Sequence, residues 1–128
     1  MRTVENRWHV RRDEALAVAQ PDVVNCGGLM QARKIAALAE TWHRPFAPHD
    51  CIGPVGFVAS VHMALSQPNT LIQETVRAYY RGYYPEVLTE LPRVADGHVY
   101  PMAGPGLGTG LAPALLARDD LVIRRSTA

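Results

Sequence analysis

The chain has 128 residues and a formal net charge of +1, with 48% hydrophobic and 20% charged residues. This composition is typical of one globular domain or part of one, with enough apolar residues to build a core, and it excludes a disordered chain. The near-neutral charge gives no reason to expect a nucleic-acid partner, and no apolar run approaches the roughly 18 residues of a membrane span.

The N-terminal segment, residues 1–13, is rich in arginine without a clear period, and we expect it to be poorly ordered. It has no apolar signal-peptide core, and the two cysteines form no disulfide framework, so the expected location is the cytoplasm. A zinc site can be imagined from the residues Cys26, His43, His49 and Cys51. Their spacing fits no compact zinc-binding pattern.

Residues 16–24 (LAVAQPDVV) are apolar and rich in valine, which indicates a buried strand that ends near Asp22. Gly27 and Gly28 then separate this predicted strand from the next element. Residues 29–42 predict a helix, because apolar side chains recur there at intervals of three and four.

The next segments repeat this order. Residues 44–48 (RPFAP) are a second strand candidate, and Asp50 is a plausible N-cap for a helix over 54–66 with Pro54 in its first turn. That helix is apolar on almost every side, so we expect it to be buried or covered by a partner. Residues 70–74 (TLIQE) are the third strand. This alternation predicts an α/β fold with a parallel sheet.

The remainder of the chain has a different character. A cluster of tyrosines and arginines at 75–84 is expected to pack against a neighbouring domain or subunit rather than to stack bases. The Pro/Gly-rich segment 85–128 is expected to be loop-like, and GPGLGTG at 104–110 fails the GxGxxG pattern of a phosphate loop. We expect His62, on the apolar helix, to be a satisfied core or interface histidine.

Three polar residues stand at the ends of the three predicted strands: Asp22, His49 and Glu74, at intervals of 27 and 25 residues. One βα unit has about this length, and side chains at the C-terminal ends of parallel strands face one mouth. Asp22 can accept a hydrogen bond from one ring nitrogen of His49, which leaves the other nitrogen as a base. Glu74, if protonated, can hydrogen-bond a substrate carboxylate. The spacing alone also fits ordinary polar residues at strand ends.

Four motifs carry a resemblance to a known family: QPDVVNCGG (20–28), APHD (47–50), NTLIQE (69–74) and GPGLG (104–108). In order and spacing they resemble the mandelate-racemase subgroup of the enolase superfamily, and in particular its galactonate-dehydratase-like members. The resemblance implies that residues 14–84 are C-terminal βα units of a TIM-type (β/α) barrel, followed by the segment 85–128.

The resemblance also implies chemistry. Asp22 and His49 would form an Asp–His dyad in which His49 removes the proton alpha to a carboxylate. Glu74 would stabilise the enediolate, together with Mg²⁺. The implied partner is a small sugar acid or another hydroxy-carboxylate, the implied reaction is a dehydration, and the full-length form would be a homo-oligomer.

The sequence departs from the family above all in its metal ligands. The family binds Mg²⁺ through three carboxylates on earlier strands, and Glu5, in ENRW at 5–8, is the candidate for the third of them, although it lies closer to Asp22 than the pattern expects. A complete barrel needs about 200 residues or more. We therefore expect a C-terminal portion that binds Mg²⁺ weakly or not at all by itself. Two alternatives remain: an inactive fragment, or a racemase, epimerase or cycloisomerase of the same superfamily.

Overall fold

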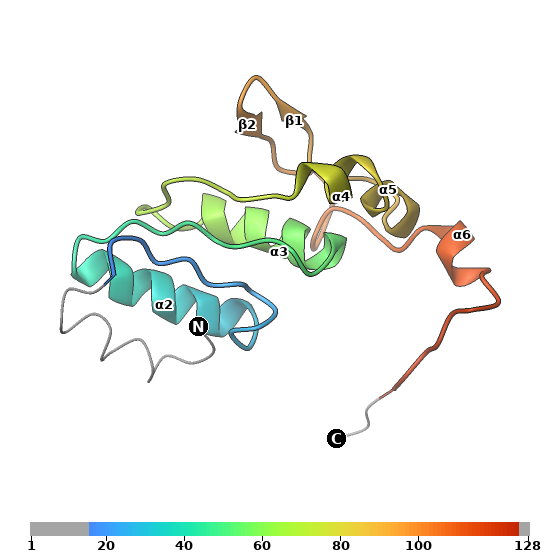
Figure 1. Cartoon of the computed structure of the whole chain (residues 1–128), viewed down its shortest axis with the longest axis horizontal. Coiled ribbons are helices and arrows are strands. Elements are labelled where there is room, and N and C mark those ends of the chain that lie inside the picture. Colours follow the sequence, from blue (N-terminus) through green and yellow to red (C-terminus); the bar gives the residue numbers. More distant parts are fainter. Residues whose placement is uncertain (1–15, 126–128) are drawn as a thin grey trace.

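The computed structural model describes residues 16–125, and Figure 1 shows its elements in chain order. Two helices dominate it, α2 (Leu29–Thr41) and α3 (Pro54–Leu65). The predicted helices over 29–42 and 54–66 are confirmed to within one residue at either end. The segment 1–13, expected to be poorly ordered, lies outside the described residues, and so does Glu5.

Three extended segments run parallel to one another beside these helices. They meet at the bridge pairs Ala19–Phe46, Asp22–His49 and Phe46–Thr70. The predicted parallel arrangement is confirmed at these pairs, although in the described part of the chain they remain isolated bridges. Three prolines explain this, because Pro21, Pro45 and Pro48 lack the N–H group that a continuous ladder requires. Residues 16–125 close no barrel, so the barrel stays a prediction.

Helix α2 begins where two glycines turn the chain. Gly27 and Gly28 have φ values of 100° and 92°, in the left-handed region that favours glycine. The face predicted from the apolar pattern is the buried one, and it comprises Ala32, Ile35, Ala36 and Ala39. This face packs against Ala19 and Phe46 of the extended segments, in one hydrophobic core.

Helix α3 contributes to a second core cluster. Phe57 and Val61 pack there against Tyr84, and all three side chains are at most 1% exposed. Tyr84 opens the short helix α5 (Tyr84–Val87), which follows α4 (Arg77–Arg81). Part of the tyrosine cluster thus packs inside the chain itself.

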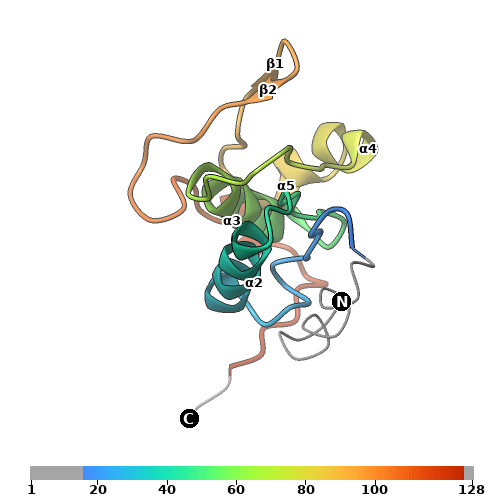
Figure 2. The same ribbon diagram turned by 90° about the vertical axis from the view of Figure 1, so that its left-hand side faces the viewer.

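The C-terminal region contains short elements that the loop prediction missed. Strands β1 (Val94–Ala95) and β2 (His98–Val99) pair antiparallel, and α6 (Pro113–Leu116) follows a long loop. Asp96 and Gly97 turn the hairpin, both with positive φ. An Asp-Gly pair between two short segments that each contain a valine, here Val94 and Val99, is a recognised hairpin signal, so the sequence contained this information. The hairpin projects away from α2 and α3 in Figure 1 and again in Figure 2.

None of the helices in residues 16–125 has the length and apolar character needed to cross a membrane.

Candidate active site

His49 lies at the end of the middle extended segment, with one of the predicted site residues on each side. Its backbone N–H donates to the carbonyl of Pro21 at 2.9 Å, which places it opposite Asp22. The backbone N–H of Glu74 donates to the carbonyl of Pro48 at 3.3 Å. These backbone hydrogen bonds bring Asp22, His49 and Glu74 to the same edge of the three parallel segments.

The His49 ring has a different partner at each nitrogen. Its Nδ1 hydrogen-bonds Oε2 of Glu74, which also accepts a hydrogen bond from Nε2 of Gln20 at 3.1 Å. Nε2 of His49 lies 3.0 Å from Sγ of Cys51. A carboxylate accepts hydrogen bonds, so the proton of the neutral ring belongs on Nδ1 and the lone pair on Nε2. Both the His49 and the Glu74 side chains are 35% exposed, so the site is open to solvent.

The predicted hydrogen bond between Asp22 and His49 is absent from the described residues. Oδ1 of Asp22 instead accepts the backbone N–H groups of Val24 at 2.7 Å and Asn25 at 2.9 Å. This local closure of a turn is a common use of aspartate, because its short side chain reaches the amides two and three residues ahead. Glu74, rather than Asp22, therefore fixes the His49 tautomer in this structure.

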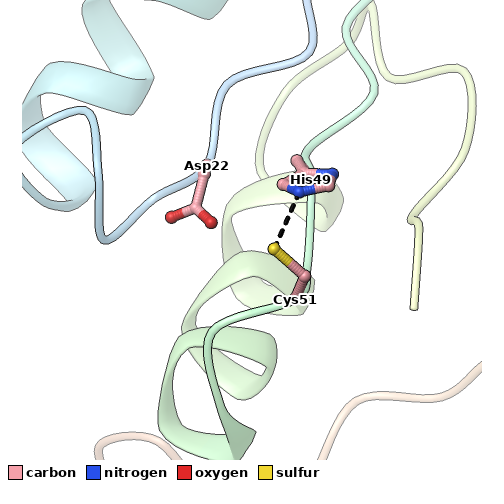
Figure 3. Close-up of side chains that lie close together, drawn as sticks. All are labelled: Asp22, His49 and Cys51. Carbon is pink, nitrogen blue, oxygen red and sulfur yellow. Dashed lines mark hydrogen bonds between the residues drawn. The ribbon is translucent and has the colours of Figure 1, made fainter. Parts of the chain in front are cut away.

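Cys51 is a member of the site that the sequence analysis did not assign to it. It is exposed, and Figure 3 shows its sulfur directed at the His49 ring. Partial desolvation and the carboxylates of Asp22, Asp50 and Glu74 raise the pKa of the Cys51 thiol, so it is protonated near neutral pH. The sequence contained a signal for this contact: Cys51 follows His49 by two residues, and alternate residues of an extended chain share one face.

Asp50 lies between these two residues and points into the core. The prediction that it caps α3 is wrong, because Gly53 occupies the N-cap position and no side chain caps the helix. Asp50 is only 3% exposed, and its carboxylate accepts hydrogen bonds from Thr75 at 3.1 Å and from the Tyr84 hydroxyl at 3.2 Å. Burial raises the pKa of Asp50, and burial together with the Asp50 carboxylate raises the pKa of Tyr84.

The donors near His49 do not fit Mg²⁺. This ion prefers octahedral oxygen coordination, whereas the residues gathered here include a ring nitrogen and a thiol. One oxygen of each neighbouring carboxylate, Asp22 and Glu74, is already engaged in two hydrogen bonds. The zinc set imagined from the sequence is not assembled either, because Cys26 is buried in the first core cluster.

The other motifs have structural explanations. The GPGLGTG loop turns at Gly106 and Gly108, both with positive φ, as expected of a turn. The Leu107 carbonyl in this loop lies 3.1 Å from Nε2 of His62, which agrees with the prediction of a satisfied histidine on α3.

Comparisons with known proteins match most of the chain. The family model described as "Enolase C-terminal domain-like" matches residues 1–115. A D-galactonate dehydratase family member from Streptomyces bingchenggensis is 43% identical over 101 residues, which are 75% of this chain and 23% of that protein. The D-galactonate dehydratase of Pectobacterium atrosepticum is 33% identical over 122 residues, 91% of this chain and 30% of that protein.

Among solved structures, an enolase of the mandelate racemase subgroup from Agrobacterium tumefaciens is 46% identical with a TM-score of 0.76. The match covers 84% of this chain and 30% of that one. The chain thus spans less than a third of the length of each of these three proteins.

Proposed function

Because the chain belongs to the enolase C-terminal domain-like family, we propose that it supplies the C-terminal catalytic residues of an enzyme that removes the proton alpha to a carboxylate. The proposed reaction is the dehydration of a sugar acid of the galactonate type. The names of the two dehydratase relatives support the reaction class. The single observation that carries the chemistry is the His49 ring, held by Glu74 through Nδ1 with Nε2 at the open side of the site.

The proposed base is Nε2 of His49. Neutral imidazole is suited to proton abstraction near neutral pH, and the Glu74 carboxylate on Nδ1 stabilises the imidazolium that forms when Nε2 takes the substrate proton. The electron pair left at the alpha carbon forms an enediolate, the hydroxyl on the beta carbon leaves as water with general-acid help, and the resulting enol becomes a 2-keto-3-deoxy acid.

Asp22 and Glu74 complete the proposed catalytic group with His49. Asp22, 8% exposed, contributes a fixed negative charge beside the ring. The role of Glu74 as a hydrogen-bond donor to the enediolate stays a prediction. It requires a proton on Glu74, whereas here Oε2 of Glu74 accepts hydrogen bonds from His49 and Gln20.

We further propose that the parallel segments at 16–24, 44–48 and 70–74 are part of a (β/α) barrel in a homo-oligomeric, cytoplasmic enzyme that uses Mg²⁺. The donors gathered near His49 in the described residues do not fit that ion. The chain by itself is therefore expected to be inactive. Within the proposed enzyme, residues 14–84 supply the base and its partners, and residues 85–128 form the segment that follows them.

The test is a chimera in which this chain replaces the homologous segment of the Streptomyces bingchenggensis relative. Chimera and isolated chain are assayed with Mg²⁺ and a panel of sugar acids for the 2-keto-3-deoxy product. We expect turnover by the chimera and none by the isolated chain. The substitution His49→Asn in the chimera should lower kcat/KM by about 10²–10⁴-fold. The matched control is His98→Gln, an exposed histidine of the β1–β2 hairpin, which should retain full activity.

Two results would contradict the proposal. Unchanged turnover in His49→Asn would remove His49 from the reaction. An epimerised acid in place of the 2-keto-3-deoxy product would favour the racemase or epimerase alternative, because that outcome returns the proton without losing water.

A further inference from the structure

Three side chains with different donor atoms meet beside the His49 ring. The ligand atoms of Asp22, His49 and Cys51 all lie within 4.8 Å of one another. Figure 3 shows them arriving from two neighbouring extended segments, with Cys51 below the ring and Asp22 beside it. Carboxylate oxygen, imidazole nitrogen and thiolate sulfur are together a donor set that suits zinc and other borderline or soft cations.

The backbone explains why these groups meet. His49 and Cys51 are two residues apart on an extended segment, so their side chains share a face while Asp50 points into the core. The Asp22–His49 bridge brings the carboxylate from the neighbouring segment. The hydrogen bonds from Val24 and Asn25 fix the carboxylate by its Oδ1, which leaves Oδ2 as the atom able to face a cation.

The contact between His49 and Glu74 is an independent indication of a metal ligand. A histidine that binds a metal through one nitrogen usually donates its other N–H group to a carboxylate, which orients the ring and raises its basicity. Here Nδ1 is bound to Glu74 and Nε2 faces Cys51. The ring nitrogen on the side of the thiol is therefore the one that carries no proton.

The distances suit a small tetrahedral ion. Bond lengths to zinc of about 2.0–2.3 Å place two ligand atoms about 3.5 Å apart. Nε2 of His49 and Sγ of Cys51 are already 3.0 Å apart, and no two of the three ligand atoms are more than 4.8 Å apart. Binding therefore requires the Asp22 carboxylate to approach the other two ligands. A thiolate is a poor ligand for Mg²⁺, so this site discriminates against that ion.

We propose that Asp22, His49 and Cys51 bind one Zn²⁺ ion, with water as the fourth ligand. On binding, the ion replaces the thiol proton of Cys51, and that proton passes to solvent. The site goes beyond the proposed function and does not depend on it. One consequence does rest on that function: zinc on Nε2 occupies the lone pair of the proposed base, so zinc inhibits the dehydration.

The test uses the 128-residue chain without a polyhistidine tag. Co²⁺ is added as a spectroscopic probe, because a cobalt–thiolate bond produces a near-ultraviolet charge-transfer band, and Zn²⁺ affinity is measured by competition with a chromophoric chelator. We expect one equivalent of either ion in the wild-type chain and no competition from Mg²⁺. Cys51→Ser should lose the charge-transfer band and weaken zinc binding by at least about tenfold.

Two further variants sharpen the result. Asp22→Asn should also weaken zinc binding at least about tenfold, and Glu74→Gln by about 10–100-fold through the orientation of His49. His98→Gln is the matched control and should bind zinc as the wild type does. Circular dichroism checks the fold of Asp22→Asn, since Asp22 also holds its own turn.

Cys51 is exposed, so Cys51→Ser decides the proposal without a folding effect. Zinc binding that is equal in the wild type and Cys51→Ser would overturn it, as would a cobalt complex without a thiolate band. Cys26 remains in this variant, so loss of the band assigns the thiolate to Cys51. The measurement contains no substrate, so its failure would leave the role of His49 as base intact.

Discussion

Two consecutive residues, His49 and Asp50, belong to regions with opposite properties. The His49 side chain is 35% exposed and meets Glu74 and Cys51 at the open edge of the extended segments. The Asp50 side is closed, since this residue is 3% exposed and its carboxylate is held by Thr75 and Tyr84. The alternation of an extended backbone thus separates reactive groups from structural ones within a single dipeptide.

Substitutions on the buried Asp50 side and on the exposed His49 side of this segment should therefore have different effects on stability. Groups on the Asp50 side lose their hydrogen bonds to water on folding, so their partners matter for stability. Groups on the His49 side keep access to solvent, so we expect their replacement to change the proposed zinc binding and catalysis with little effect on the fold. Stability measurements on the two sides therefore test whether the separation is real.

The largest expected effect on stability is that of Tyr84→Ala. Tyr84 is fully buried against Phe57 and Val61, and removing a large aromatic side chain from a core costs about 3–5 kcal/mol. Urea unfolding followed by circular dichroism measures the loss. The matched control is Tyr100→Ala, whose ring is 38% exposed and should cost only about 0.5–1 kcal/mol, through its contact with Arg93. Equal losses of unfolding free energy in Tyr84→Ala and Tyr100→Ala would show that the buried side is no more important for stability than the exposed surface.

Asp50→Ala is expected to have an intermediate effect. It leaves the hydroxyls of Thr75 and Tyr84 without their acceptor, at a cost of about 1–3 kcal/mol at about pH 4. The same unfolding experiment measures it, and Asp119→Ala, at an exposed aspartate, is the control that should leave the urea midpoint unchanged. An Asp50→Ala chain as stable as the wild type would show that this network does not hold the fold.

The stability contributed by Asp50 should also depend on pH. Burial raises its pKa above the ordinary value of 3.8, so the folded chain binds this proton more tightly than the unfolded chain does. The contribution is fully present below pH 3.8 and is lost as the pH rises through the raised pKa. The stability difference between wild type and Asp50→Ala should therefore shrink from about pH 4 to about pH 7. A stability difference that grew from about pH 4 to about pH 7 would contradict a raised pKa of Asp50.

The smallest expected effect is that of Cys51→Ser on the other side of the segment. The thiol is exposed and its hydrogen bond is with the His49 ring at the open edge, so the urea midpoint should not change. The same variant is expected to lose zinc binding, which separates ligand binding from stability. A marked fall in stability would place Cys51 with the structural residues instead.

Much of the fold was accessible from the sequence because the signals were local. Apolar residues at intervals of three and four predicted α2, and Pro54 marked the start of α3. The spacing of Asp22, His49 and Glu74 predicted that they lie together, since successive βα units place equivalent residues at one edge. The Asp-Gly turn at 96–97 was an equally local signal, although it lies in a segment whose Pro and Gly content is typical of a loop.

The hydrogen-bond partners of individual side chains could not be predicted from such local signals. The sequence could not show that Glu74, and not Asp22, binds Nδ1 of His49, because that choice depends on side-chain positions across three segments. Nor could it show that Asp50 pairs with Tyr84, which lies 34 residues away. A local capping position was the simpler interpretation, and the tertiary contact displaced it.

The sequence by itself determined the family, the order of helices and extended segments, and the presence of an acid, a histidine and a second acid at equivalent positions. The family follows from the resemblance of four sequence motifs, and the other features follow from periodicity and spacing, which are properties of the chain. Only the tertiary structure decided which carboxylate orients His49, that Cys51 joins the site and that Asp50 leaves it. These are matters of distance between segments far apart in the chain, and they are settled by packing and by the need of buried polar groups for partners.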